Sequence, residues 1–304
     1  MRILVIGDLH GRKPRIPTKN FDCMVVVGDV CDDRGIAPLY NAWFGELKKN
    51  PELDFEELAA KKLRSKKRLG VLEKRSLKRG AEIMKYLDSF EKPIFMVAGN
   101  WDQSYGKDKI GKTNKNKYLS SINRYNSRLL KGKINSKLIG GLKNVRDCMY
   151  NCYEFSGINF IGYGLSSSPE VADKKNGFTR KQVGNLKRAI KKIDDKLSKV
   201  YKSRKNRKLF TFFISHNIPY NTKLDIINNP KSYVHKKHMG SKIARDFCIK
   251  FQPEICVGGH IHECQGKDKI GKTLVVNTGF GPKSTVLVEI NVKKKKIKKV
   301  EFIK

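Results

Sequence analysis

Near its amino terminus the chain reads Arg2-Ile3-Leu4-Val5-Ile6-Gly7-Asp8-Leu9-His10-Gly11. Its run of aliphatic residues is typical of a short strand that is buried on both faces. The run stops at Gly7, and two side chains of metal-binding type, Asp8 and His10, follow at once. We therefore expect an α/β protein whose functional groups lie where its strands end.

The same pattern, an apolar run that stops at a small residue followed by a polar one, recurs four more times. The runs cover residues 23–27, 93–98, 209–214 and 254–257. They lead into Gly28-Asp29, Gly99-Asn100, Ser215-His216 and Gly258-Gly259-His260-Ile261-His262. Because the carboxyl ends of strands meet at one edge of an α/β sheet, we expect these Asp, Asn and His side chains to lie close together.

Other segments predict the elements that frame this edge. Further strands are expected at 153–155, 158–161, 274–276, 285–291 and 297–303, the first two joined by a turn at Ser156-Gly157. Helices are expected at 52–90, 179–201 and 241–251, and the second has one apolar stripe made of Val183, Leu186, Ile190, Ile193, Leu197 and Val200. We expect a single domain over 1–304 with insertions at approximately 40–90, 103–148 and 170–208, the second being loop-rich with one helix near 118–130.

The charge balance favours a polyanionic partner. The chain has 65 Lys and Arg against 29 Asp and Glu, a formal net charge of +36. Heat-adapted proteins are enriched in Lys and Glu together, but here Glu does not rise with Lys. Two segments, 61–80 and 180–208, concentrate the excess, and basic helix faces of this kind neutralise phosphates. Nucleic acid or a nucleotide is the partner that this charge suggests, and the plainer interpretation is a pair of solvated helix faces.

Cysteine usage and hydropathy predict the compartment. The seven cysteines are odd in number and contain no C-x-x-C pair, which favours reduced thiols over disulfides or a zinc site. No stretch approaches the ~20 apolar residues that cross a bilayer, and the run at Ile3–Ile6 is too short for a signal peptide. We expect a cytoplasmic protein without membrane association, and its oligomeric state stays open.

The ordered set Asp8-x-His10, Gly28-Asp29, Gly99-Asn100, His216 and Gly259-His260-x-His262 resembles the calcineurin-like metallophosphoesterase family. Four of the six His lie on these motifs, so chance is a poor explanation. The resemblance implies a four-layer α/β fold, a two-sheet β-sandwich flanked by helices. It also implies a phosphoric ester hydrolase in which two divalent cations acidify a bridging water and clamp the phosphate. Manganese, iron, nickel and zinc all suit such ligands.

The resemblance also implies a role for each motif residue. Asp8, His10 and His262 would hold one cation. Asn100, His216 and His260 would hold the second, and Asp29 would bridge the two. Of these, Asp29, Asn100 and His216 are the expected catalytic residues. In the second motif, Asp32 or Asp33 would orient a ligand His, and Arg34 would contact phosphate.

The third motif departs from the family pattern. Many members have a His after Gly-Asn, which is thought to contact the phosphate or to protonate the leaving group, and an acid that orients it. Here the residues are Trp101 and Asp102, and an indole cannot transfer a proton. Asp102 is then expected to be structural. His235 and His238, in the segment 218–240, are the hypothetical substitutes, and the plainer interpretation is that both belong to a surface loop.

A repeated octapeptide imitates a nucleotide-binding loop. Gly106–Thr113 and Gly266–Thr273 both match G-x-x-x-x-G-K-T. A phosphate-binding loop must follow a strand and open a helix. The second copy instead runs into Leu274-Val275-Val276, which predicts a hairpin turn, and the first runs into residues that start helices poorly. An ATPase is therefore not predicted.

Two functions remain after these observations. The first is an active hydrolase, most simply a phosphodiesterase acting on nucleotides or nucleic acid. The alternative is a non-catalytic or weakly active module that uses the same fold to bind nucleic acid. Ligand-competent residues at every motif position favour the enzyme, and Trp101 is the one feature that favours the module.

Overall fold

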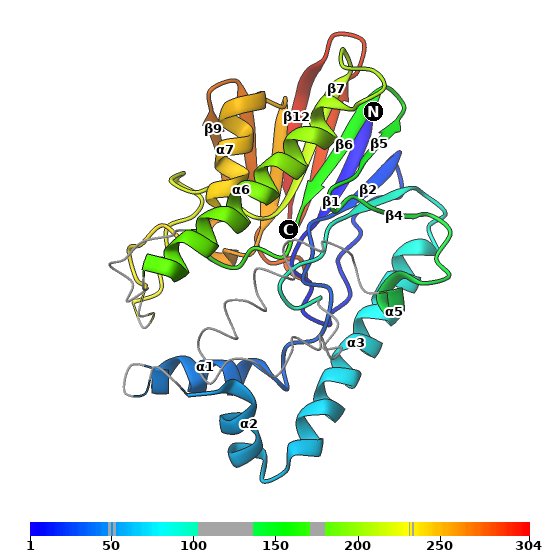
Figure 1. The fold of residues 1–304 in the computed structure, drawn as a ribbon. Helices are drawn as coiled ribbons and strands as arrows, with labels where there is room; N and C mark the ends of the chain where they lie inside the picture. The colour runs from blue at the N-terminus through cyan, green and yellow to red at the C-terminus, as the bar shows by residue number, and fades with distance from the viewer. Residues whose placement is uncertain (48–49, 51–52, 103–135, 171–179, 231, 233) are drawn as a thin grey trace.

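Two six-stranded sheets pack face to face in the computed structural model, which describes residues 1–47, 50, 53–102, 136–170, 180–230, 232 and 234–304 (Figure 1). The first sheet has the order β12-β11-β1-β2-β3-β4 and the second has the order β5-β6-β7-β8-β10-β9. Helices flank both sheets. The predicted α/β two-sheet sandwich is therefore confirmed.

The strands of the first sheet are β1 (Arg2–Ile6), β2 (Cys23–Val26), β3 (Ile94–Met96), β4 (Val145–Asp147), β11 (Thr285–Asn291) and β12 (Lys296–Ile303). Those of the second are β5 (Cys152–Phe155), β6 (Ile158–Tyr163), β7 (Phe210–Asn217), β8 (Ile255–Gly259), β9 (Gly266–Ile270) and β10 (Thr273–Asn277). The central strands of each sheet, β1–β4 and β6, β7, β8 and β10, pair in parallel. Their carboxyl ends therefore meet at one edge of each sheet.

Aromatic stacking joins the sheets in the interior. The ring of Phe95 on β3 lies 3.9 Å from that of Phe160 on β6, nearly parallel, and Phe160 in turn packs at 5.4 Å on Phe212 of β7. All three rings are buried. Because the residues of β1, β2, β3, β6, β7 and β8 are almost all buried, the continuous apolar runs of the sequence correspond to strands covered on both faces.

The helices are α1 (Ala37–Leu47), α2 (Phe55–Leu63), α3 (Lys66–Asp88), α5 (Ser136–Ile139), α6 (Arg180–Lys202) and α7 (Lys242–Phe251). In Figure 1, α6 and α7 lie side by side over the second sheet, whereas α1, α2 and α3 project beyond the strands of the first. The buried residues Ile83, Met84 and Leu87 anchor the far end of α3 in the main core. The predicted helices 179–201 and 241–251 are confirmed.

The region 52–90 is helical, as expected, and the chain forms two helices there. Arg64 has a left-handed backbone (φ 52°) that caps α2, and Ser65 begins the next helix. The helix α1 and the short elements α5 and β4 were not predicted. A three-residue strand carries too few residues to show a pattern, and β4 is defined by its pairing with β3.

The second octapeptide ends in the predicted hairpin turn, and its first five residues form a strand that was not predicted. Residues Gly266–Ile270 form β9, Gly271 turns with φ 57°, and β10 follows antiparallel. The first copy, 106–113, and the helix expected near 118–130 lie outside the described residues.

Within the described segments, no helix has both the length and the hydropathy that a membrane span requires. All seven cysteines are free. The domain limits stay a prediction.

We expect Phe160→Ala to lower the free energy of unfolding by about 3–5 kcal/mol, because it removes the ring that joins the two sheets. Urea unfolding followed by circular dichroism would measure this change. Val71→Ala is the control, since Val71 is the most exposed large apolar residue of α3 and its loss should change little. Equal stability losses for the two variants would contradict this account of the core.

Candidate metal centre

Two clusters of potential metal ligands lie at the edge where the parallel strands end. Asp8, His10 and His262 form one, and Asp29, His216 and His260 form the other. Within each cluster the candidate ligand atoms lie within 4.8 Å of one another. The acids and His10 follow strands β1 and β2 of the first sheet, whereas the remaining His come from β7 and from the turn after β8 of the second. The site therefore exists only because the two sheets pack together.

Asp29 lies between the two clusters. Its Oδ2 is 3.8 Å from Nε2 of His10 and 3.5 Å from Nε2 of His216, which belong to different clusters. Its Oδ1 accepts a 2.8 Å hydrogen bond from the backbone N–H of Trp101, which orients the carboxylate. This is the position that the bridging role of Asp29 requires.

The imidazole rings direct unprotonated nitrogens into the site. His216 donates from Nδ1 to the carbonyl of Val27 at 2.9 Å, so its Nε2 faces Oδ1 of Asn100, also at 2.9 Å. His260 donates from Nε2 to the carbonyl of Ser167 at 3.1 Å, which leaves Nδ1 for a ligand. Burial, reinforced by His216, lowers the pKa of His260 to about 3, so this ring is neutral at physiological pH. Such second contacts orient His for metal binding.

The other cluster is arranged in the same manner. Nε2 of His10 lies 3.1 Å from Nε2 of His262, and Nδ1 of His10 lies 3.0 Å from Oδ2 of Asp33. Of the two acids predicted to orient a ligand His, Asp33 therefore takes this position. Burial lowers the pKa of His10, but the neighbouring Asp33 and Asp29 outweigh burial and hold this pKa above its ordinary value. These two acids therefore favour the protonated, positively charged form of His10.

Two buried carboxylates lie among the imidazoles of the site. Burial raises the pKa of Asp8, but His262, His216 and His10 outweigh it, so the pKa lies below its usual value. Burial and the nearby Asp8 raise the pKa of Asp29 well above its usual value. Oδ1 of Asp8 is buried and accepts no hydrogen bond from the described residues. A divalent cation beside it would satisfy this oxygen and offset the charge, so the residues fit a metal.

Backbone strain accompanies the ligands. Asp8, His10, Asp29 and His260 have φ values of 28°, 46°, 52° and 65°, in the left-handed region that non-glycine residues rarely adopt. Each follows directly or closely on the strand that carries it. A Cβ on Gly259 would lie 1.8 Å from Oδ2 of Asp8, so glycine is needed for His260 N–H to donate to that oxygen at 2.8 Å. Strain of this kind is typical of functional sites.

The third-motif acid is structural, as expected. Asp102 is buried, and its Oδ1 accepts hydrogen bonds from the N–H groups of Val30 (2.8 Å) and Cys31 (2.9 Å). Its Oδ2 accepts one from Gly99 at 2.9 Å. These bonds tie the turn that carries Asp29 to the turn that carries Asn100.

The indole of Trp101 occupies the place beside the centre where many family members have a His. Its ring lies edge-on to that of His10 at 6.5 Å and to that of Tyr40 on α1 at 5.3 Å. Tyr40 in turn stacks on Phe55 of α2 at 4.0 Å. Trp101 thus connects the metal-binding edge to the helical insertion.

The remaining predicted residues lie farther from the ligands. Asp32 forms a bidentate pair with Arg34 (2.8 and 2.9 Å), so this acid orients an arginine and not a His, and the phosphate contact of Arg34 stays a prediction. Nδ1 of His238 lies 2.7 Å from Oδ1 of the buried Asp225, which also accepts backbone N–H groups of its loop. His235 is half-buried, and its Nδ1 has no hydrogen-bond partner among the described residues. These contacts favour the loop interpretation for His238.

One residue that holds the site was not predicted. Glu170 is buried and accepts hydrogen bonds from Ser166 Oγ at 2.6 Å and from the backbone N–H of Lys242 at 2.8 Å. It joins the start of α7 to the loop whose Ser167 carbonyl holds His260. Burial raises the pKa of Glu170. The contacts join segments about seventy residues apart, so the sequence contains no local pattern for them.

Comparison with known proteins agrees with this geometry. The sequence model of calcineurin-like phosphoesterases matches residues 1–264. An uncharacterized protein of Methanocaldococcus jannaschii is 37% identical over 133 residues, 43% of this chain and 51% of that protein. The chain thus matches about half the length of this curated relative.

One solved structure shows the same fold. One crystal structure covers 100% of this chain and 99% of its own with a TM-score of 0.56 at 18% identity, a likeness that shows the fold alone. A purple acid phosphatase from yellow lupin (Lupinus luteus) covers 100% of this chain and 53% of its own at 10% identity, with a TM-score of 0.44. The match over residues 1–264 shows that the chain belongs to the calcineurin-like phosphoesterase family.

Proposed function

We propose that this protein is a metal-dependent phosphoesterase that hydrolyses phosphodiesters, with nucleotides or nucleic acid as the substrate class. The observation that carries the proposal is the position of Asp29, whose carboxylate lies within 4 Å of imidazoles from both ligand clusters. Family membership supports the reaction class, and the net charge of +36 supports an anionic substrate.

The residues would divide between two cations. Asp8, His10 and His262 would hold one, Asn100, His216 and His260 the other, and Asp29 would contact both. Two divalent cations bound there would acidify a water molecule and stabilise the charge on the phosphoryl oxygens. The mixture of carboxylate, imidazole and amide ligands suits manganese, iron, nickel or zinc equally.

The protein groups have separate tasks in this proposal. Val27, Ser167 and Asp33 hold three imidazoles so that each directs a nitrogen inward. Asp102 holds the turns of Asp29 and Asn100 together. Trp101 stands beside His10 and supplies no proton, so the reaction depends on the ability of the leaving group to depart unaided.

We expect Asp29→Ala to reduce metal-dependent hydrolysis of bis-p-nitrophenyl phosphate by more than about a hundredfold, since even weaker perturbations of a metal site cost 10–100-fold. Titration calorimetry with Mn²⁺ should show fewer bound cations. Asp195→Ala, the same change on the exposed face of α6, is the matched control and should retain both properties. If the wild-type protein bound Mn²⁺ but showed no Asp29-dependent hydrolysis, the nucleic-acid-binding module would be the better interpretation.

We expect the wild-type rate to fall steeply as the leaving group becomes more basic, and Trp101→His to flatten this dependence. The reason is that general acid catalysis is worth about 10²–10⁴-fold where a leaving group needs a proton. Rates over a series of substituted phenyl and alkyl phosphodiesters would measure the slope. Trp101→Phe, which removes the indole without adding a proton donor, should keep the wild-type slope. If Trp101→His left the dependence of the rate on leaving-group basicity unchanged, the idea that Trp101 replaces a general acid would be contradicted.

We expect Glu170→Ala to weaken Co²⁺ binding at the His216–His260 cluster by about 10–100-fold and to spare the other cluster, because it releases the loop that holds His260. Calorimetry and the visible absorption of the Co²⁺-loaded protein would separate the two sites. The control is Glu154→Ala, at an exposed position of β5, which should bind as wild type does. Equal weakening of both sites would indicate general unfolding and not a positioning role for Glu170.

A further inference from the structure

The edge of the sandwich opposite the metal centre carries two basic segments, residues 202–208 and 292–298, which we call the basic rim. The first runs from the last residue of α6 toward β7, and the second contains the turn between β11 and β12 and the first residues of β12. His216 lies six residues beyond Phe210 on β7, so the rim and the metal-binding edge are about 20 Å apart along this strand. A molecule bound to the rim therefore does not occupy the metal centre.

Contacts with the β5–β6 hairpin place the two segments side by side. A Cβ on Gly157, in the turn of this hairpin, would lie 2.8 Å from Cγ1 of Val292. Nδ2 of Asn159, two residues farther along, donates to the carbonyl of Asn206 at 2.9 Å. Figure 1 shows the same arrangement, with the β11–β12 hairpin rising beside the start of β7.

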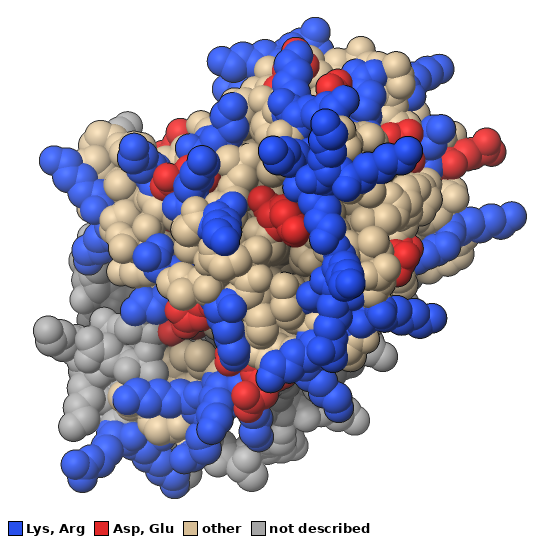
Figure 2. All heavy atoms as spheres, turned by 90° about the horizontal axis from the view of Figure 1, so that it is seen from above, with Lys and Arg blue, Asp and Glu red and all other residues tan. Residues whose placement is uncertain are grey.

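The rim is cationic and has no acidic residue of its own. Its exposed cations are Lys202, Lys205, Arg207, Lys208, Lys293, Lys294, Lys295, Lys296 and Lys298. None of the ion pairs formed by the described residues involves these side chains. Figure 2 looks onto this face and shows Lys and Arg spread across it, with Asp and Glu scattered and fewer. Unpaired cations at this density attract a polyanion.

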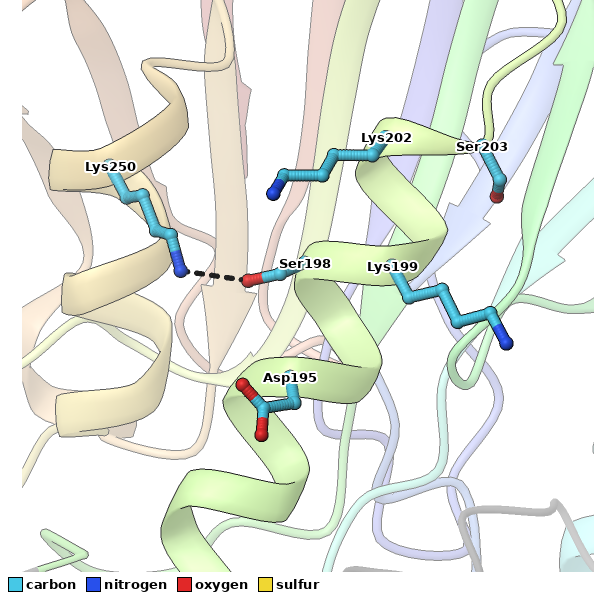
Figure 3. A pocket seen from close by; sticks show the side chains of 6 residues that line it. All are labelled: Asp195, Ser198, Lys199, Lys202, Ser203 and Lys250. Carbon is cyan, nitrogen blue, oxygen red and sulfur yellow. Dashed lines mark hydrogen bonds between the residues drawn. The ribbon is translucent and has the colours of Figure 1, made fainter.

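Two surface depressions lie at the same end of the strands as the rim. One, of about 470 Å³, lies between α6 and α7 and is lined by Lys199, Lys202, Lys250, two serines and Asp195 (Figure 3). The other, of about 520 Å³, lies before β2 and β3 and combines Lys19 and Lys92 with the rings of Phe21, Tyr86 and Phe90. The rings of Tyr86 and Phe90 meet edge-on at 5.4 Å, and both are only half-buried.

We propose that the basic rim binds single-stranded nucleic acid, with lysines on the phosphates and the Tyr86–Phe90 depression taking an unpaired base. Lysine beside partly exposed aromatic rings is the combination by which proteins bind single strands without sequence preference, and Lys13 Nζ already lies 4.9 Å from the ring centroid of Tyr86. An anionic membrane surface is a poorer match, because the exposed large apolar side chains among the described residues, Val71 and Ile249, lie outside the rim.

This surface is separate from the proposed hydrolytic function, and a binding assay without turnover tests it. Fluorescence anisotropy of a labelled single-stranded oligonucleotide would be followed between about 50 and 200 mM salt without added metal. The rim variant is Lys293→Gln/Lys294→Gln/Lys296→Gln. The matched control, Lys61→Gln/Lys74→Gln/Lys78→Gln, removes the same charge from exposed positions on α2 and α3.

We expect wild-type affinity to fall steeply with salt. The rim variant should bind at least about tenfold more weakly at the lowest salt, with a salt slope smaller by about two, since each lost phosphate contact removes ~0.7. The control should bind as wild type does. Asp29→Ala should also bind as wild type does, which separates this test from that of the phosphoesterase. Hydrolysis of bis-p-nitrophenyl phosphate by the rim variant should be unchanged.

Three results would overturn the proposal. The first is that the wild-type protein fails to bind the oligonucleotide at low salt. The second is that the rim and control variants lose affinity equally, which would assign binding to net charge and not to the rim. The third is that the rim variant loses binding to phosphatidylserine vesicles while keeping that to the oligonucleotide, which would assign the surface to a membrane.

Discussion

The packing of one sheet on the other brings the ligand residues of this protein together. The first sheet carries Asp8, His10, Asp29 and Asn100, and the second carries His216, His260 and His262. Hydrogen bonds cross between the sheets at the site, from His216 to the Val27 carbonyl and from the backbone of His260 to Asp8. The stacked rings of Phe95 and Phe160 hold the sheets together farther inside. Without that contact, each sheet would hold only part of a metal centre.

The ligand edge is unfavourable in isolation. It holds two buried carboxylates, one buried oxygen without a hydrogen bond, and four residues in left-handed backbone conformations. Such strain persists only where the surrounding structure over-determines it, and the buried strands on both sides of the edge provide that support. The candidate ligands converge at one edge, and hydrogen bonds that involve backbone groups hold Asp8, His216 and His260. These are the properties that a site for divalent cations requires, because the ligands need little reorganisation on binding.

Charge is distributed differently at the two ends of the strands. At their carboxyl ends, acids and imidazoles meet, and the pKa of His10 is raised by its acidic neighbours. At the opposite end the basic rim collects lysines that no described acid pairs, and the depression between α6 and α7 adds Lys250, which pairs with Asp194. A chain of high net positive charge thus keeps a cluster of acids and imidazoles about 20 Å from a positively charged surface. The helical insertion adds a third feature, an aromatic contact from Tyr40 and Phe55 through Trp101 to the ligand edge.

Local chemistry explains what could be predicted. A strand buried on both faces must be apolar throughout, a turn with positive φ favours particular residues, and an amphipathic helix repeats every 3.6 residues. These requirements act over a few residues, so the strand ends, the ligand residues and the helix over 179–201 were visible in the sequence alone. Other features depend on residues far apart in the chain. They are the contact of His10 with Asp33 and not Asp32, the anchoring by Glu170, the strand β4, and the grouping of two basic segments at one edge. Only the tertiary structure decided them, because no local pattern records which distant segments pack together.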